Sequence, residues 1–237
     1  MNLDFDRTIA TITLNRPDNG NSIDNEMSHA LSNAFELIAE NDGLRLLILT
    51  ADGEVFSVDK MTDRSSNPAE QLSALSIPVL VALNGDASGS GLELALAGDL
   101  RVCVPAAKFS FPGLERGVLP QDGGTQRLPR LIGPAWARDM LITGRSVDAN
   151  EALSIGLVNR VSEDIAGTVS EISAQITAGS PIGVRYAKEA VGKGMDLTLE
   201  QGLRLEADLN VILQSTSDRA EGLKSFLEKR PPKFIGS

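Results

Sequence analysis

Apolar and polar positions along the first fifty residues follow patterns that predict strands and helices in turn. Thr8–Leu14 is β-branched and alternates between apolar and polar residues, which is typical of a half-buried strand. Asn25–Glu40 carries an apolar stripe at helical spacing, with Asp24 placed as its N-cap. Leu44–Thr50 is almost continuously apolar, as expected of a buried strand.

The next segment repeats this alternation of strand and helix. Pro78–Leu83 and Leu100–Val104 are apolar runs that predict two buried strands, and Leu92–Ala97 between them is predicted to be helical. A strand, a helix and a strand in this order favour an α/β fold with a parallel sheet. The polar stretch Thr62–Gln71 predicts a mobile loop.

The second half of the chain is predicted to be mainly helical. Two short helical segments, 136–144 and 150–156, precede a long helical tail from about Ile165 to Lys229, which Ser180–Gly183 interrupts. An amphipathic tail of this kind has to cover an apolar surface, either on its own sheet or on a neighbouring subunit. The length of 237 residues and the apolar fraction of 42% suit one compact domain.

Charge and composition restrict the function. A net charge of -10 would repel nucleic acid from most of the surface. Neither a signal segment nor an apolar run long enough for a membrane is evident, so we expect a cytoplasmic protein with no membrane partner. Cys103 lies in an apolar strand and predicts a small buried side chain. His29, the one histidine, lies off the apolar stripe and is expected at the surface, which leaves a serine nucleophile without the usual base.

A glycine-rich turn joins the strand that ends at Leu83 to the helix that carries Glu93. The turn has Gly89 and Gly91 on either side of a serine, between a strand and a helix, as in a dinucleotide-binding fingerprint. However, Leu94 stands where the third glycine is needed, and the next strand ends without the ribose-binding acid. The pattern therefore disfavours a dinucleotide site.

Five ordered segments resemble the crotonase superfamily, the enoyl-CoA hydratase/isomerase family, along nearly the whole chain. They are LNRPDNGNSID, IPVLVALNGDASGSGLELALAGDLRV, FPGLERGVLPQDGGTQRLPRLIG, LITGRSVDANEALSIGLVNRV and EGLKSFLEKRPPKF. The resemblance implies an α/β, crotonase-like fold of repeated ββα units over residues 1–180 and a C-terminal helical trimerisation region over residues 181–237. It further implies acyl-CoA thioester substrates, no metal, no cofactor beyond the coenzyme A of the substrate, and a homotrimer or dimer of trimers.

The resemblance also implies an oxyanion hole, in which two backbone N–H groups hold the thioester oxygen. Each such donor typically lowers the barrier by about 3 kcal/mol. The family takes one donor from the middle of a glycine triplet, and that position is Ser90, between the substrate-binding Gly89 and Gly91. The other donor lies in a loop of the form F-S-A-G-A-D, which here reads VFSVDKM and is two residues shorter. Val58 is the candidate for this donor and Asp59 for the aspartate of the loop.

Hydratases of this family divide their acid–base chemistry between two glutamates. Glu93 matches the first, whereas Gly113 occupies the position of the second. Loss of one acid–base group typically costs about 10²- to 10⁴-fold in rate. Some isomerases and hydrolases of the family carry an aspartate where this chain has Gln121, which can orient water but cannot take a proton. Asp122, the next residue, either reaches the pocket or caps the following helix.

The closing segment FLEKRPPKF matches a block whose basic residues often lie near CoA phosphates, so Lys229 and Lys233 are candidate substrate-binding residues. These features predict an acyl-CoA-directed enzyme of fatty acid metabolism, most closely an enoyl-CoA hydratase, a lyase. The alternatives are an isomerase, a decarboxylase or a thioester hydrolase that uses one acid, and a non-catalytic CoA-thioester-binding or scaffold protein. RNA binding, found in some members, is disfavoured by the acidic charge.

Overall fold

A computed structural model describes residues 1–59 and 67–237. The chain forms two compact units, which are Met1–Leu75 with Val79–Ser170, and Ser76–Pro78 with Glu171–Ser237. The predicted domain boundary between residues 180 and 181 stays a prediction.

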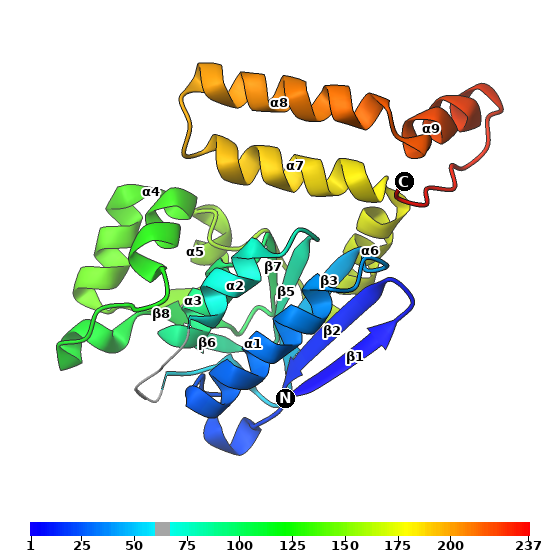
Figure 1. Cartoon of the computed structure of the whole chain (residues 1–237). Coiled ribbons are helices and arrows are strands. Elements are labelled where there is room, and N and C mark those ends of the chain that lie inside the picture. Colours follow the sequence, from blue (N-terminus) through cyan, green and yellow to red (C-terminus); the bar gives the residue numbers. More distant parts are fainter. Residues whose placement is uncertain (60–66) are drawn as a thin grey trace. The chain divides into compact units, whose positions relative to one another are not determined.

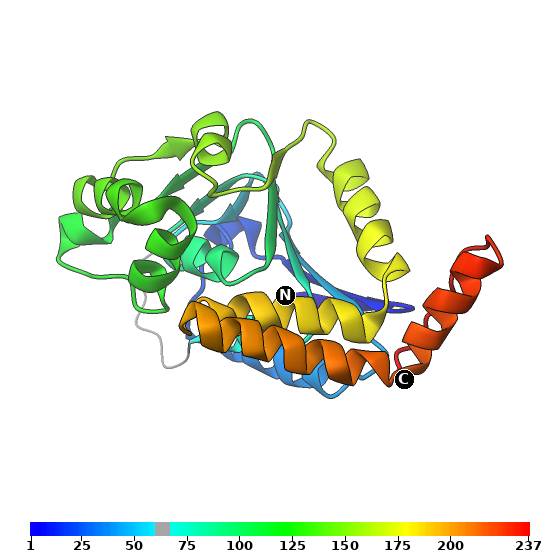
Figure 2. The same cartoon turned by 90° about the horizontal axis from the view of Figure 1, so that it is seen from above.

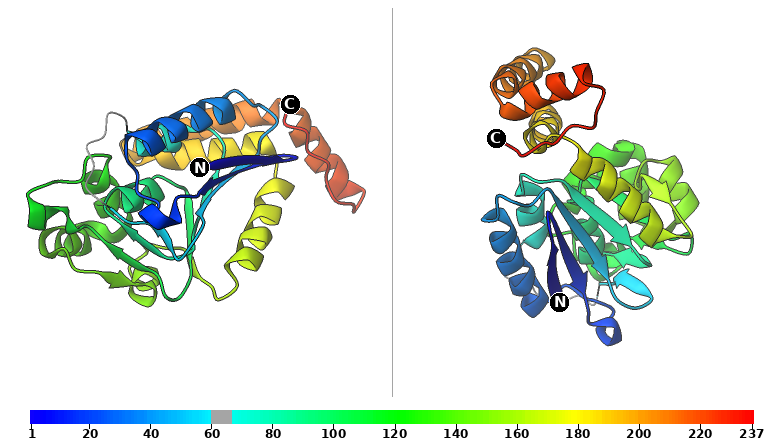
Figure 3. Two further views of the ribbon diagram at one scale, coloured as in Figure 1. Left: turned by 90° about the horizontal axis from the view of Figure 1, so that it is seen from below. Right: turned by 90° about the vertical axis from the view of Figure 1, so that its right-hand side faces the viewer.

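The first unit contains a large sheet, whose described strands follow the order β1-β2-β3-β5-β7-β10 (Figure 1). They are β1 (Asn2–Asp6), β2 (Ile9–Leu14), β3 (Leu46–Ala51), β5 (Val79–Leu83), β7 (Leu100–Cys103) and β10 (Arg160–Val161). All neighbours pair parallel except the β1–β2 hairpin, which forms one edge of the sheet in Figure 3. β5 is buried at every position, which explains its continuous apolar sequence.

A second, smaller sheet in the same unit consists of short strands in the order β4-β6-β8-β9. They are β4 (Val55–Ser57), β6 (Asp86–Ser88), β8 (Lys108–Ser110) and β9 (Val147–Asp148). β4, β6 and β8 run parallel to one another, whereas β9 is antiparallel to β8. The carboxyl ends of β4, β6 and β8 therefore lie at one edge of this sheet.

Strand, strand and helix repeat along the first unit. β3 and β4 precede α2 (Pro68–Ala74), and β5 and β6 precede α3 (Ser90–Leu96). β7 and β8 precede the 3-10 turn η2 (Pro112–Arg116) and then α4 (Gly124–Thr143). The first strand of each repeat joins the large sheet and the second joins the small one. The predicted α/β fold of repeated ββα units is thus confirmed.

The helix α1 (Asn25–Ala39) follows the short 3-10 turn η1 (Pro17–Asn19). Asp24 is its N-cap, as predicted, because its side chain accepts a hydrogen bond from the Met27 N–H. The apolar stripe of α1 is buried, and α1 lies beside α2 on one face of the large sheet (Figures 1 and 3). His29 is exposed and Cys103 is fully buried, which confirms both predictions.

Two predicted boundaries of the first unit are wrong. The predicted loop over residues 62–71 ends earlier, because α2 begins at Pro68, a residue suited to the first helical position. Residues 62–66 of that prediction lie outside the described residues. α3 begins at Ser90 rather than Leu92, since Gly89, with φ 51° and ψ -120°, ends the extended backbone. The helix α5 (Ala149–Ser154) completes this part of the fold.

The helical tail runs from α6 (Ile165–Ala178), which begins in the first unit, through the helices of the second. These are α7 (Pro181–Gly194), α8 (Leu199–Gln214) and α9 (Ser217–Leu227). The sequence predicted one interruption, but each of these three helices begins at its own N-cap, namely Ser180, Thr198 or Thr216. α7 and α8 pack side by side (Figure 2). None of the described helices is long and apolar enough to cross a membrane.

Candidate active site

The loops that follow β4 and β6 meet at the carboxyl edge of the small sheet. The Asp59 N–H donates to Ser88 Oγ at 3.0 Å, and the Gly89 N–H donates to the Ser110 carbonyl at 3.0 Å. These two bonds tie the turn after β6 to the shortened loop on one side and to β8 on the other. The structure therefore brings Asp59 next to Gly89, two residues that the resemblance assigns to the site.

The two glycines of the turn are required by close packing. A Cβ atom at Gly89 would lie 2.3 Å from Asp59 Oδ2, and the φ of Gly89 is +51°. A Cβ atom at Gly91 would lie 2.4 Å from the Ser57 carbonyl oxygen. The shortened loop thus packs directly against the turn, and only glycine permits this approach without displacing backbone.

Ser90 lies between these glycines and is the first residue of α3. An N–H group at the first helical position has no acceptor within its own helix. Its residue is buried, with 5% of its surface exposed. Ser90 therefore offers a backbone donor at the position where the resemblance places one, with a side chain larger than the usual glycine.

Val58 does not provide the second donor in this structure. Its N–H donates to the Gly20 carbonyl oxygen at 2.9 Å, so the predicted role of Val58 in an oxyanion hole conflicts with an existing bond. The neighbouring Asn21 is fully buried, with φ +51°, and its Nδ2 donates to the carbonyls of Asp52 and Val55. The LNRPDNGNSID segment therefore anchors β4, a role that the sequence did not reveal.

Glu93, on α3, is buried with 2% of its surface exposed. Its Oε1 accepts hydrogen bonds from the N–H groups of Asp122 at 2.7 Å and Gly124 at 2.8 Å. Its Oε2 accepts from the Gln121 N–H at 3.3 Å. The carboxylate is thus held by a row of backbone donors at the beginning of α4, where the helix end also favours negative charge. We call the N–H groups of Gln121, Asp122 and Gly124 the Glu93 cradle.

Gln121 and Asp122 differ in what their side chains do. Gln121 is exposed, and it is bonded to Glu93 through its main-chain N–H. Asp122 is buried, and its Oδ2 accepts a hydrogen bond from the Ala69 N–H at 2.8 Å, in the first turn of α2. Sequence reasoning considered the pocket and α4 as its destinations but did not consider α2.

Gly113, at the position of the second family glutamate, lies within the η2 turn. Its carbonyl accepts a hydrogen bond from the Val118 N–H at 3.0 Å. A Cβ atom at Gly113 would lie 2.6 Å from the Val118 carbonyl oxygen, closer than side-chain atoms normally approach backbone. The η2 turn therefore leaves no room for a side chain at the position that the resemblance assigns to a second glutamate.

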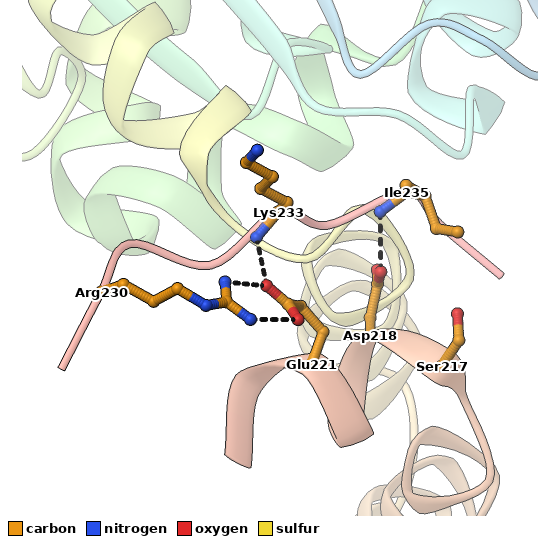
Figure 4. Close-up of a pocket in the computed structure, with 6 residues that line it drawn as sticks. All are labelled: Ser217, Asp218, Glu221, Arg230, Lys233 and Ile235. Atoms are coloured by element: carbon orange, nitrogen blue, oxygen red, sulfur yellow. Dashed lines mark hydrogen bonds and ion pairs between the residues drawn. The ribbon is translucent and has the colours of Figure 1, made fainter. Parts of the chain in front are cut away.

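Lys229 and Lys233 belong to the second unit. Lys229 follows the end of α9 with φ +52°, and the Lys233 N–H donates to Glu221 Oε1 at 2.8 Å. A pocket of about 420 Å³ is lined by Ser217, Asp218, Glu221, Arg230, Lys233 and Ile235 (Figure 4). The Arg230 guanidinium pairs with Glu221 at 2.6 Å, and its hydrogen bonds lower the pKa of that carboxyl. In Figure 4 the Lys233 ammonium points away from this pair.

Acidic, histidine and cysteine side chains form no cluster of three or more that suits a metal ion within the described part of the chain. The described residues place a buried carboxylate, that of Glu93, beside the glycine-rich turn. Such an arrangement can accept and return a proton next to a polarised carbonyl.

Repeated ββα units that carry a buried glutamate behind a glycine-rich turn define a crotonase-type protein. The chain belongs to the enoyl-CoA hydratase/isomerase family, whose sequence model matches residues 4–237. It is 40% identical over 246 residues to the Bacillus subtilis protein YngF, named as an enoyl-CoA hydratase/isomerase, covering 96% of this chain and 95% of YngF. It is 34% identical over 251 residues to the crotonyl-CoA hydratase of Syntrophomonas wolfei, covering 98% and 96%.

The fold has the same support from solved structures. The crystal structure of an enoyl-CoA hydratase from Bacillus anthracis matches with a TM-score of 0.92 and 33% sequence identity. The match covers 100% of this chain and 99% of that one. Together with the family match, this likeness supports an enzyme of the enoyl-CoA hydratase/isomerase type.

Proposed function

We propose that this chain hydrates enoyl-CoA thioesters, with Glu93 as its acid–base residue. The observation that carries the proposal is the position of Glu93, a buried carboxylate held by three backbone N–H groups and located one turn beyond Ser90 on α3. The cradle fixes the carboxylate, so its geometry is set before the substrate binds. A positioned acid–base group of this kind typically contributes about 10²- to 10⁴-fold to the rate.

In the proposed reaction, the Ser90 N–H donates to the thioester oxygen and stabilises the enolate that forms there. Glu93 takes a proton from water as the water oxygen bonds to the β-carbon of the double bond. The same carboxylate then returns this proton to the α-carbon, and the thioester carbonyl re-forms. The net change is the addition of one water molecule. One acid serves both steps, because Gly113 supplies no second carboxylate.

Isomerisation is the second candidate, and Gly113 is the observation that favours it. A 3-enoyl thioester becomes a 2-enoyl thioester when one base removes a proton from C2 and returns it to C4. This reaction needs no activated water, so a single carboxylate suffices. The turn at Gly113, closed by the Val118 carbonyl, is compatible with this chemistry.

The remaining predictions from the resemblance are part of the same proposal. The substrate is an acyl-CoA thioester whose coenzyme A is the only cofactor-like group, with Gly89, Gly91 and Asp59 shaping its binding site. Lys229 and Lys233 lie near the CoA phosphates. The assembly is a homotrimer or a dimer of trimers. These statements follow from the family, and each is open to direct measurement.

The experiment compares wild-type protein with Glu93→Gln on crotonyl-CoA and on a 3-enoyl-CoA thioester. Product mass separates the two reactions, since hydration adds one water and isomerisation leaves the mass unchanged. We expect Glu93→Gln to lower kcat by about 10²- to 10⁴-fold. Glu115→Gln is the matched control, because it neutralises an exposed glutamate on the η2 turn. Retained binding of acyl-CoA without turnover would instead support a non-catalytic thioester-binding protein.

A further inference from the structure

We propose that Asp122 and Arg127 are positioning residues that lock the Glu93 cradle to helix α2, and that Asp122 is not an acid–base group. The proposal deepens the proposed function of Glu93, and its kinetic test rests on that function. A residue of this kind acts through another one. Its removal therefore changes the geometry of Glu93 rather than a proton-transfer step.

Asp122 connects the cradle to α2 through two different parts of its structure. Its main-chain N–H donates to Glu93 Oε1 at 2.7 Å, while its side-chain Oδ2 accepts from the Ala69 N–H at 2.8 Å. Both Glu93 and Asp122 are buried, so neither bond is easily replaced by water. Movement of the Asp122 side chain would accordingly disturb the hydrogen bond from the Asp122 N–H to Glu93.

Arg127, on α4, reinforces this connection from the other side. Its Nη1 donates to the Asp122 carbonyl at 2.7 Å, and its Nη2 donates to Ser73 Oγ at 3.1 Å and to the Ala69 carbonyl at 3.4 Å. The N–H and the carbonyl of Ala69 are therefore both bonded, one to Asp122 and the other to Arg127. The segment 121–124, which carries the Glu93 cradle and which we call the cradle loop, therefore accepts a hydrogen bond from the first turn of α2. Arg127 joins the same two segments by donating to a carbonyl of each.

The glycines of the loop show how closely it is enclosed. Gly123 has φ +93°, and a Cβ atom there would lie 2.3 Å from Arg127 Nη1. A Cβ atom at Gly124 would lie 3.1 Å from Glu93 Oε1. The loop thus lies between the Arg127 guanidinium and the Glu93 carboxylate, and the positive φ of Gly123 favours glycine at that position. Tight enclosure is what a positioning role requires, since a shift of about 1 Å can cost about 10²-fold in rate.

Asparagine at position 122 separates positioning from proton transfer. Its amide oxygen can still accept a hydrogen bond from the Ala69 N–H, but the side chain has no titratable proton. We expect Asp122→Ala to lower kcat by about 10²-fold with little change in KM. Asp122→Asn is expected to recover most of that loss. An equal loss in both variants would overturn the proposal and assign proton transfer to Asp122.

The matched control is Asp148→Ala. Asp148 Oδ1 also accepts a backbone N–H, that of Glu151 at 2.9 Å, at the start of another helix. Its removal also deletes a carboxylate that accepts an N–H in the first turn of a helix, which typically lowers stability by about 1 kcal/mol. Since Asp148 bonds to Glu151 and lies in β9, away from the Glu93 cradle, kcat should stay near that of the wild type. A comparable kcat loss in this control would mean that general destabilisation explains the Asp122 result.

Hydrogen exchange tests the lock without any substrate. Loss of the lock should speed exchange of the Asp122 and Gly124 amides, measured by NMR, in Asp122→Ala and in Arg127→Met but not in Asp148→Ala. Unchanged protection of these amides in both lock variants would overturn the proposal even in an active enzyme. If exchange is faster in these two variants but the wild-type protein turns over no enoyl thioester, the lock is supported and the proposed function of Glu93 is refuted.

Discussion

Gly113 and Val118 are so close that a Cβ atom at position 113 would lie 2.6 Å from the Val118 carbonyl oxygen. The same two residues are joined by a hydrogen bond of 3.0 Å from the Val118 N–H to the Gly113 carbonyl. The position that the resemblance assigns to a second glutamate is therefore part of a closed turn, which has no room for a carboxylate side chain.

Gly113→Glu is consequently expected to destabilise the protein rather than restore efficient hydration. Forcing a side chain against a backbone carbonyl typically costs about 1–3 kcal/mol. Urea unfolding measures this cost as a lower midpoint. Leu114→Glu is the matched control, because it adds the same side chain at an exposed neighbour in η2. Unchanged stability together with a large gain in hydratase activity would show that the turn opens readily.

Ser90 is expected to act through its backbone N–H and not through its hydroxyl group. Ser90→Ala keeps the N–H and should retain most of kcat. Ser90→Pro removes it, and proline is well tolerated at the first position of a helix. Loss of one oxyanion donor typically lowers kcat by about 10²- to 10³-fold. Steady-state kinetics of the two variants, with circular dichroism to verify folding, decide the matter. A larger loss in the alanine variant would point to the hydroxyl group.

Local patterns predicted the elements that carry their own signal. The capped helix α1 and the buried strands β5 and β7 lie within a residue or two of their predicted bounds. The short strands β4, β6 and β8 were not predicted individually, because segments of three residues are too short to show a period. The resemblance supplied the ββα repeat that these strands complete.

The sequence predicted which residues belong to the site better than it predicted the hydrogen bonds between them. The resemblance pointed to Glu93, but the donors that hold this carboxylate lie 28 to 31 residues further along the chain. The spacing of residues within one segment cannot predict a contact between residues so far apart in the sequence. The bond that conflicts with the predicted role of Val58 was not predicted for a related reason, since its acceptor, Gly20, comes from the segment before α1. A deletion in the loop made the family pattern ambiguous at that position.

Cys103 is expected to make stability fall as the pH rises from about 9 to about 11. Burial raises the pKa of this thiol from 9.0 to about 11, so the folded chain keeps a proton that the unfolded chain loses in this window. The contribution is fully present below pH 9 and decreases by up to about 1.4 kcal/mol for each pH unit above it. Urea unfolding across this range, with Cys103→Ala as the control, measures the difference. Identical pH slopes in both proteins would contradict the prediction.

We expect the chain to form oligomers through the helices of the second unit. Several large apolar side chains of its helices are highly exposed in the single chain, including Leu199 at 80%, Phe226 at 81% and Leu227 at 80%. Exposed apolar surface of this kind favours association with another subunit. Light scattering should give the mass of three or six chains, and Phe226→Asp or Leu227→Asp should lower it.

The matched control for this assembly is Leu119→Asp, which places the same charge at a 61% exposed leucine of the first unit. Its mass should equal that of the wild type, because the trimer is proposed to form through the C-terminal helices. Desolvating an unpaired carboxylate in an interface is costly, so one aspartate per subunit suffices to weaken the assembly. A wild-type protein that remains monomeric at micromolar concentration would refute the assignment. A mass lowered only by Leu119→Asp would move the interface to the first unit.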